Sequence, residues 1–318
     1  MRTRCFVGFD TSNYTTSAAV CTEAGEIVAN LKAPLPVKEG ECGLRQSDAV
    51  FSHVRNLPVL MQQLREVVRD YEVLAVGCSV RPREADGSYM PCFLAGRAAA
   101  EVFAASIDVP VFEFSHQDGH IMAALYSSGD ADRLLTAPFA AFHVSGGTTE
   151  ALYVEPRENA FSVTLIGKTE DLNAGQAIDR VGVAMGLKFP CGREMETLAN
   201  AYEGKLPSVR ICVKNGNCNL SGLQNLAEKI WRETGDRSLV SAYVFSFVGE
   251  TLRAMTNAID ARFSQEIAVL YAGGVMSNRR IQAMLACRKN TYFADPQFSA
   301  DNAAGIALLC RRGYLSYN

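Results

Sequence analysis

Two segments of this sequence share one layout: an apolar strand, a turn rich in small polar residues, and a second strand. Residues 6–20 read FVGFDTSNYTTSAAV, residues 142–154 read FHVSGGTTEALYV, and each turn carries a Thr-Thr pair before its second strand. Hairpins with such turns are common, so chance is one explanation of the likeness. The other is a duplicated fold with a cleft between its two halves.

Apolar runs and helical patterns alternate along almost the whole chain. The expected strands are 5–9, 17–21, 27–31, 74–80, 109–114, 139–144, 150–154, 162–167, 209–213 and 267–272. The expected helices are 50–71, 92–107, 119–127, 175–187, 194–202, 220–233, 238–263, 278–288 and 302–314. This alternation favours α/β layers over a sandwich or a bundle. The polar stretch 126–137 is the natural boundary, which predicts one lobe over 1–130 and another over 131–318.

Charge and cysteine usage narrow the possible partners. The chain has 31 basic and 34 acidic residues, a net charge of −3, which argues against a broad nucleic-acid surface but leaves a local basic patch open. No apolar run reaches the roughly 18 residues of a membrane helix, and the start lacks a signal-peptide pattern. The ten cysteines are scattered without a Cys-x-x-Cys pair, so we expect reduced thiols in a cytoplasmic protein.

Two histidines four residues apart are the strongest chemical signal. His116 and His120 follow an expected buried strand and lie where a helix continues. On a helix this spacing places both imidazoles on one face, where the two side chains can bind the same metal ion. A zinc peptidase would need Glu after the first histidine, but Gln117 stands there, so protease chemistry is disfavoured.

A third ligand is one interpretation of Asp301. This residue opens the last expected helix, where a carboxylate also suits the helix dipole without any metal. As a ligand it would complete a set of two imidazoles and one carboxylate, with positions left open for phosphate oxygens. Such a set suits zinc or iron better than magnesium.

Glycine-rich turns after apolar strands suggest contacts with phosphate. In 145–149 (SGGTT), paired glycines would let backbone N–H groups approach a phosphate, although a tight hairpin turn, taken singly, is the simpler explanation. Segment 272–280 joins an expected strand to the start of an expected helix. Helix N-termini favour anions, so this segment either binds an anion or is an ordinary helix cap. Asp179 is either a solvated surface carboxylate or a ribose ligand.

Short segments match, in order, the motifs of one known family. They are 8–12 (GFDTS), 53–55 (HVR), 115–120 (SHQDGH), 144–147 (VSGG), 174–180 (AGQAIDR), 185–187 (MGL), 189–192 (FPCG), 220–223 (LSGL), 273–279 (GGVMSNR) and 300–302 (ADN). On these residues the chain resembles the tRNA threonylcarbamoyl-adenosine transferase (TsaD) family, once misnamed a glycoprotease family. The resemblance runs from Gly8 to Ala307.

The resemblance implies a fold and a set of ligand-binding residues. The fold is the duplicated actin-like ATPase fold, two lobes with a nucleotide cleft between them and a last helix returning toward the N-terminal lobe. His116, His120 and Asp301 would hold a divalent metal, iron or zinc, with Ser145 as a further ligand; magnesium would accompany the nucleotide. The residues implied for binding ATP or an acyl-adenylate are Ser145, Gly146, Gly147, Asp179, Gly192, Glu196 and Asn278.

Departures from the family pattern lie at other positions. Segment 11–16 (TSNYTT) lacks the acidic pair of the family, and Arg81–Pro91 is longer than its Gly-Pro-Gly loop. Gln224 stands in place of a lysine and Thr148 in place of a histidine. Metal and nucleotide positions are kept while positions facing the acceptor change, which indicates a divergent paralogue.

The leading hypothesis is a metal-dependent, adenylate-binding carbamoyl-type transferase acting on tRNA adenosine, with accessory subunits or self-association as expected partners and no membrane. One alternative is a scaffold or sensor subunit that binds nucleotide and metal without turnover. Another is carbamoyl transfer to a small molecule, which the acidic net charge fits.

Overall fold

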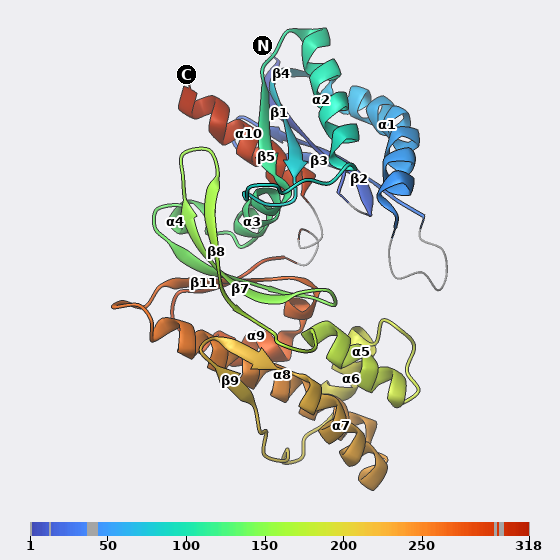
Figure 1. The fold of residues 1–318 in the computed structure, drawn as a ribbon, viewed down its shortest axis with the longest axis vertical. Coiled ribbons are helices and arrows are strands. Elements are labelled where there is room, and N and C mark those ends of the chain that lie inside the picture. Colours follow the sequence, from blue (N-terminus) through green and yellow to red (C-terminus); the bar gives the residue numbers. More distant parts are fainter. Residues whose placement is uncertain (1, 13, 37–43, 296–297, 299–301, 318) are drawn as a thin grey trace. The chain divides into compact units, whose positions relative to one another are not determined.

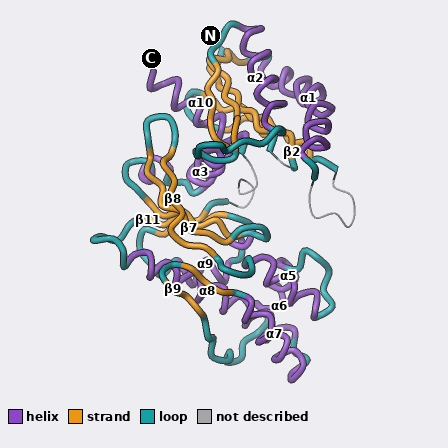
Figure 2. The backbone as a smooth tube through the Cα atoms, viewed as in Figure 1, coloured by secondary structure: helices purple, strands orange, loops and turns teal. Residues whose placement is uncertain are grey.

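A computed structural model describes residues 2–12, 14–36, 44–295, 298 and 302–317 (Figure 1). The chain divides into two compact units. Unit 1 consists of residues 1–126, 156–162 and 300–318, and unit 2 of 127–155 and 163–299. The last helix therefore belongs to the unit that the N-terminal residues form. Figure 2 shows that helices and strands alternate along the backbone.

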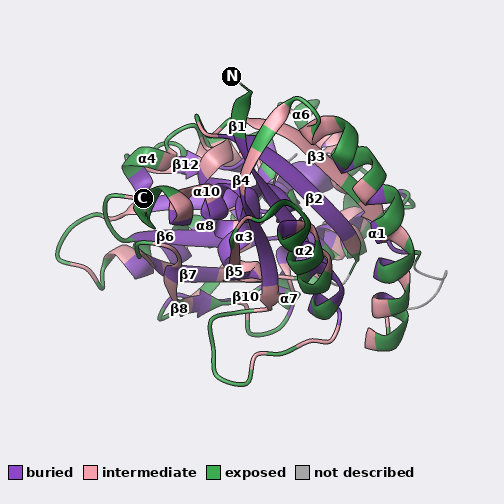
Figure 3. Ribbon diagram, turned by 90° about the horizontal axis from the view of Figure 1, so that it is seen from above, coloured by how far each residue is buried: buried purple, intermediate pink, exposed green. Residues whose placement is uncertain are grey.

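The centre of unit 1 is a five-stranded sheet in the order β3-β2-β1-β4-β5. Its strands are β1 (Thr3–Asp10), β2 (Thr15–Thr22), β3 (Ile27–Pro34), β4 (Tyr71–Arg81) and β5 (Val111–Ser115). The first three strands pair antiparallel, and β4 and β5 then add in parallel. The central strands carry the most buried side chains, as Figure 3 shows for β1, β2 and β4.

Helices cover both faces of the unit 1 sheet. Helices α1 (Gln46–Val68) and α2 (Phe93–Ile107) pack on one face, and α10 (Ala303–Tyr317) packs on β1, β2 and β4. Gly8 permits the close approach of α10, because a Cβ at this position of β1 would overlap the backbone of α10. A shorter helix, α3 (His116–Ser127), follows β5 directly.

Unit 2 repeats the topology of unit 1. Its strands are β6 (Phe139–Val144), β7 (Thr149–Pro156), β8 (Phe161–Lys168), β11 (Ala268–Ala272) and β12 (Thr291–Phe293), in the order β12-β11-β6-β7-β8. Here too a meander of three consecutive strands is extended by two parallel strands beside its first strand. The segments 6–20 and 142–154 are the equivalent hairpins β1–β2 and β6–β7, so the duplication expected from them is confirmed.

Helices and short elements complete unit 2. They are α4 (Ala131–Leu134), α5 (Ala174–Ala184), α6 (Gly192–Asn200), β9 (Cys212–Lys214), β10 (Asn217–Asn219), α7 (Ser221–Thr234), α8 (Arg237–Asp260), the 3₁₀ helix η1 (Gly274–Ser277) and α9 (Arg279–Leu285). Helix α8 is the most buried of them, and α6, α7 and α9 pack against it. The strand expected over 209–213 forms as β9, at the C-terminal end of that range. The three-residue strands β10 and β12 were not expected.

None of the described helices is long and apolar enough to cross a membrane. The nine cysteines that the structure describes are all free thiols, and seven of them are buried. Burial raises the pKa of Cys5, Cys21 and Cys78 to about 12, so these thiols stay protonated and unreactive at neutral pH.

Helices α3 and α10 touch through two glycines, which predicts a large effect for a small change. A Cβ on Gly305 would overlap the carbonyl oxygen of Gly119. We expect Gly305→Ala to lower the free energy of unfolding by about 1–3 kcal/mol, the usual cost of overpacking, in urea denaturation. Gly222→Ala is the control, because a Cβ there meets nothing within 4 Å. Equal stability of the two variants would contradict this packing.

Candidate functional site

A buried carboxylate stands at the end of the central strand of unit 1. Asp10 is 2% exposed, and its Oδ1 accepts hydrogen bonds from the Ser79 hydroxyl and from His116 Nδ1, the latter at 3.0 Å. Its Oδ2 accepts from the Ser12 hydroxyl at 2.8 Å. Burial alone would raise the pKa of Asp10, but the charge and hydrogen bond of His116 and the two hydroxyls outweigh it and lower that pKa. Asp10 is therefore ionised.

The two histidines of the sequence pattern both lie on α3. The helix begins at His116 rather than at Gly119, because Ser115 and Asp118 form a capping box. The Ser115 hydroxyl accepts from the Asp118 backbone N–H at 3.1 Å, and Asp118 Oδ2 accepts from the Ser115 backbone N–H at 3.3 Å. One helical turn then brings His116 and His120 together, with ring centroids 4.6 Å apart.

Asp10 lies against one nitrogen of His116. His116 Nδ1 is 3.0 Å from Asp10 Oδ1, and an ionised carboxylate accepts, so this contact favours the tautomer with the proton on Nδ1. In the neutral imidazole the lone pair is then on Nε2, the usual arrangement of a metal-binding histidine whose other nitrogen is held by a carboxylate.

Asn302 faces the same imidazole from the start of α10. Its Nδ2 lies 2.7 Å from His116 Nδ1 and 3.1 Å from Nε2, so the amide lies directly against the imidazole. Asn302 is 4% exposed, and its Oδ1 has no hydrogen-bond partner in the described structure. A buried polar atom without a partner is costly and indicates a ligand that completes the site.

The donor set of unit 1 fits a divalent cation. His116 and His120 have ring centroids 4.6 Å apart, so the two imidazoles lie close enough to bind one cation. They line a cavity of about 420 Å³ together with Asp10, Tyr14 and Asn302. Within the described residues no group of three His, Cys, Asp or Glu side chains is arranged around a metal position. The expected third ligand, Asp301, lies outside the described residues.

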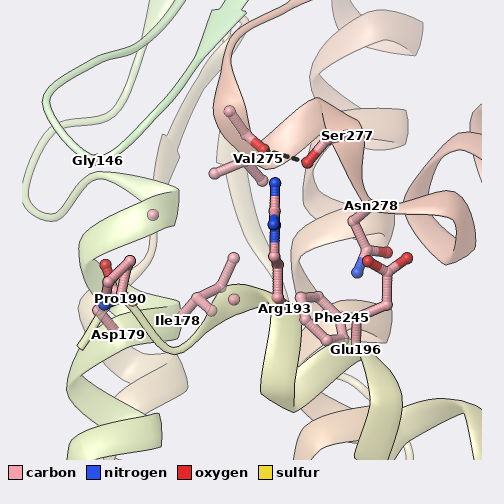
Figure 4. A pocket seen from close by; sticks show the side chains of 13 residues that line it. Gly146, Ile178, Asp179, Pro190, Arg193, Glu196, Phe245, Val275, Ser277 and Asn278 are labelled. Carbon is pink, nitrogen blue, oxygen red and sulfur yellow. Dashed lines mark hydrogen bonds between the residues drawn. The ribbon is translucent and has the colours of Figure 1, made fainter. Parts of the chain in front are cut away.

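A separate pocket of about 400 Å³ lies within unit 2 (Figure 4). It is lined mainly by α5, α6, η1 and the turn after β6. Three of its glycines, Gly146, Gly192 and Gly274, have ordinary φ angles, and a Cβ on any of them would meet nothing within 4 Å. Packing therefore does not require glycine at these positions. The missing side chains leave space in the pocket, as expected of a site that binds a ligand.

Two helix N-termini and Arg193 line this pocket, together with the carboxylates of Asp179 and Glu196. Gly175 lies in the first turn of α5, and Gly192 and Arg193 begin α6, so two helix N-termini line the pocket. On α5 the backbone N–H groups of Ala174 and Gly175 already donate, to the Thr149 hydroxyl and to the Ser145 carbonyl oxygen. Gly175 is also packed against the turn after β6, since its Cβ would come within 2.7 Å of the Gly146 backbone. This arrangement suits the phosphates of a nucleotide.

The predicted nucleoside residues line the same pocket. Asp179 and Glu196 lie on opposite sides of it in Figure 4, and each accepts one backbone N–H, from Cys191 and Arg279 respectively, at 2.8 Å. Each carboxylate keeps a second oxygen. Asn278 caps α9 through its Oδ1, while its buried Nδ2 has no hydrogen-bond partner in the described part of the chain. This donor is available to a ligand.

Ser145 and Gly147 are the remaining predicted residues. The Ser145 hydroxyl accepts from the backbone N–H groups of Gly147 and Thr148, at 3.3 and 3.1 Å, so it shapes the turn. Both residues belong to the unit 2 turn, and the role of Ser145 as a metal ligand remains a prediction.

Sequence reasoning assigned no role to two residues of these sites. Asp10 lies 106 positions from its partner His116, and only its place at the end of an apolar strand, in the segment 8–12, marked it. Arg193 is exposed, lines the unit 2 pocket and points toward Ser277 and Val275 in Figure 4. A basic residue directly after the segment 189–192 was the available signal.

Known proteins of similar sequence belong to one family. The family model of TsaD, tRNA N6-adenosine threonylcarbamoyltransferase, matches residues 49–308. The tRNA N6-adenosine threonylcarbamoyltransferase of Streptococcus sanguinis is 30% identical, over 90% of this chain and 84% of its own. That of Ligilactobacillus salivarius is also 30% identical, over 98% and 91%. The Methanopyrus kandleri enzyme is 29% identical, over 95% and 85%.

Solved structures with little sequence identity share the fold. Full-length HypF, in a phosphate- and nucleotide-bound form, superposes with a TM-score of 0.59 at 11% identity, covering 98% of this chain and 56% of HypF. The (R)-2-hydroxyglutaryl-CoA dehydratase component A of Acidaminococcus fermentans gives 0.53 at 11% identity, with 97% and 98% covered. These likenesses show the duplicated actin-like ATPase fold. With that fold and these relatives, the chain belongs to the TsaD family of tRNA N6-adenosine threonylcarbamoyltransferases.

Proposed function

We propose that this chain transfers a threonylcarbamoyl group from an acyl-adenylate to tRNA adenosine, using a cation at His116 and His120. The observation that carries the proposal is the paired imidazoles on α3, one of them held by an ionised carboxylate, in a chain of this family. Iron and zinc are the metals that imidazole and carboxylate ligands suit, and magnesium would accompany ATP.

The adenine nucleotide would occupy the unit 2 pocket. The N–H groups that begin α6 would bind its phosphates, and Gly146 and Gly192 leave the space for it. The free oxygens of Asp179 and Glu196 can accept the ribose hydroxyls, and Asn278 Nδ2 can donate to the base or to a phosphate. All the nucleotide contacts proposed here come from unit 2.

The reaction consists of one substitution at a carbonyl carbon. The exocyclic amine of adenosine attacks the carbamoyl carbon, the bond from that carbon to the adenylate oxygen breaks, and AMP and a proton leave. A bound cation would supply Lewis-acid polarisation of a donor oxygen. In the described structure Asp10 Oδ1 lies 3.0 Å from His116 Nδ1, and the hydroxyls of Ser79 and Ser12 donate to Asp10.

A transfer assay tests the proposal directly. Purified protein, loaded with iron or zinc, is mixed with threonylcarbamoyl-adenylate, unmodified tRNA and the accessory subunits of a threonylcarbamoylation complex. We expect threonylcarbamoylated adenosine in the tRNA digest by mass spectrometry. No product with any accessory set would exclude the tRNA activity, and product on a small amine alone would instead support carbamoyl transfer to a small molecule.

A subunit that binds nucleotide and cation without turnover is the second candidate. Gln224, which stands where the family has a lysine, donates its amide to Glu228 at 2.8 Å on α7, so this position offers no positive charge. Tight ATP binding without product on any acceptor would favour this candidate. Accessory subunits, self-association and action in the cytoplasm remain proposals, the last supported by the free thiols.

Arg193 gives a prediction that separates phosphate binding from nucleoside binding. No hydrogen bond or ion pair of its guanidinium occurs within the described structure, and it lines the pocket beside the N-terminus of α6. We expect Arg193→Ala to weaken ATP binding about tenfold and adenosine binding much less, because a charge-assisted hydrogen bond is worth about 1.5–3 kcal/mol. Calorimetric titration measures both. Arg232→Ala, on α7 outside the pocket, is the control, and equal losses for ATP and adenosine would refute the role.

A further inference from the structure

Four side chains hold the Asp10 carboxylate in one position. Oδ1 accepts from Ser79 and His116, and Oδ2 accepts from Ser12 at 2.8 Å and from Asn302 Nδ2 at 3.5 Å. These contacts come from β4, α3, the turn after β1 and the residue before α10. Asp10 lies at the end of β1, a strand packed between β2 and β4, so its backbone is fixed as well.

We propose that Asp10 is the positioning residue of the cation site, which fixes the tautomer and the ring orientation of His116 so that Nε2 is presented to the cation. The inference rests on the cation site of the proposed function and assigns to Asp10 a role that sequence reasoning gave to no residue. Asp10 itself does not need to touch the cation.

The geometry of the contact supports a positioning role over a purely structural one. The imidazole of His116 is 22% exposed, whereas the Asp10 side chain is 3% exposed, so the carboxylate is the fixed partner and the ring the adjustable one. Without Asp10 the ring could turn about its Cβ–Cγ bond, and either nitrogen could carry the proton. Carboxylates that hold a metal-binding histidine in this way typically contribute about 10–100-fold to metal affinity.

The first measurement is cation binding by the full chain, with no substrate present. Zn²⁺ is titrated by calorimetry and Co²⁺ by its visible absorption. We expect Asp10→Asn to bind both ions about 10–100-fold more weakly than the unsubstituted protein, with an altered Co²⁺ spectrum. In the His116→Ala background the same substitution should have almost no further effect, because the ring through which it acts is gone.

The matched control is Asp118→Asn. Asp118 is also a buried carboxylate, on α3 itself, but its hydrogen bonds go to Ser115 and not to either histidine. We expect its cation affinity to stay within about threefold of the unsubstituted protein. Equal losses of cation affinity in the Asp10 and Asp118 variants would show that the effect is general destabilisation, and would overturn the proposal.

A second measurement does not depend on the folding of any variant. Long-range ¹H–¹⁵N NMR of histidine-labelled, metal-free protein reports the tautomer of each neutral imidazole, and the proposal requires the Nδ1–H form for His116. The Nε2–H form, or cation affinity in Asp10→Asn equal to that of the unsubstituted protein, would overturn it. If His116→Ala retains full cation affinity, the cation site of the proposed function is wrong instead, so the two failures are distinguishable.

Discussion

Replacing both His116 and His120 by alanine is expected to lower the affinity of the protein for Zn²⁺ or Co²⁺ at least about a thousandfold. A structural zinc site of four ligands is worth about 10–16 kcal/mol, or roughly 3 kcal/mol per ligand. Loss of two ligands therefore removes about 6 kcal/mol, and each 1.4 kcal/mol is a factor of ten. Each single variant should lie between the double variant and the unsubstituted protein.

The same double variant should keep its nucleotide affinity. The residues proposed to bind ATP all belong to unit 2, so ATP titrated in the presence of a chelator should bind as before. His143→Ala is the control for loss of a histidine, since His143 lies on β6 of unit 2. A double variant that still binds Zn²⁺ with the original affinity would show that α3 is not the cation site.

The sequence contained enough local signal to predict the fold. The hairpins at 6–20 and 142–154 are both formed within about fifteen residues, and their shared layout suggested the duplicated fold that the two sheets of matching strand order show. Strands β10 and β12 were missed because three residues are too few to show a period of two. Helix α3 begins at His116, three residues before the expected range 119–127, because the capping box of Ser115 and Asp118 starts the helix ahead of the apolar run.

The candidate site was harder to predict because its contacts cross long stretches of chain. The helical spacing of His116 and His120 is a local signal, and the structure places both on α3. The contacts of His116 with Asp10 and Asn302 span 106 and 186 positions and depend on which strands become neighbours. No periodicity in one sequence encodes such a pairing, so only the folded sheet reveals that a carboxylate holds the first histidine.

The unit 2 pocket, proposed to bind the nucleotide, gives the second prediction of large effect. Gly192 is the first residue of α6 and faces the pocket, and a Cβ there meets nothing within 4 Å. Gly192→Val should fold normally but place a branched side chain where the ligand lies. Overlap of this kind costs about 1–3 kcal/mol, so we expect ATP affinity to fall by about 10–100-fold. Calorimetric titration with ATP measures it.

Gly222→Val separates filling of the pocket from the effect of valine on a helix. Gly222 is the second residue of α7, a Cβ there also meets nothing within 4 Å, and it does not line the pocket. Both substitutions add a β-branched residue to the first turn of a helix, so their effects on stability should be similar and small. Only the Gly192 variant should lose ATP affinity. If both variants bind ATP as the unsubstituted protein does, the nucleotide lies elsewhere, because a ligand in this pocket would have to share its space with the new side chain.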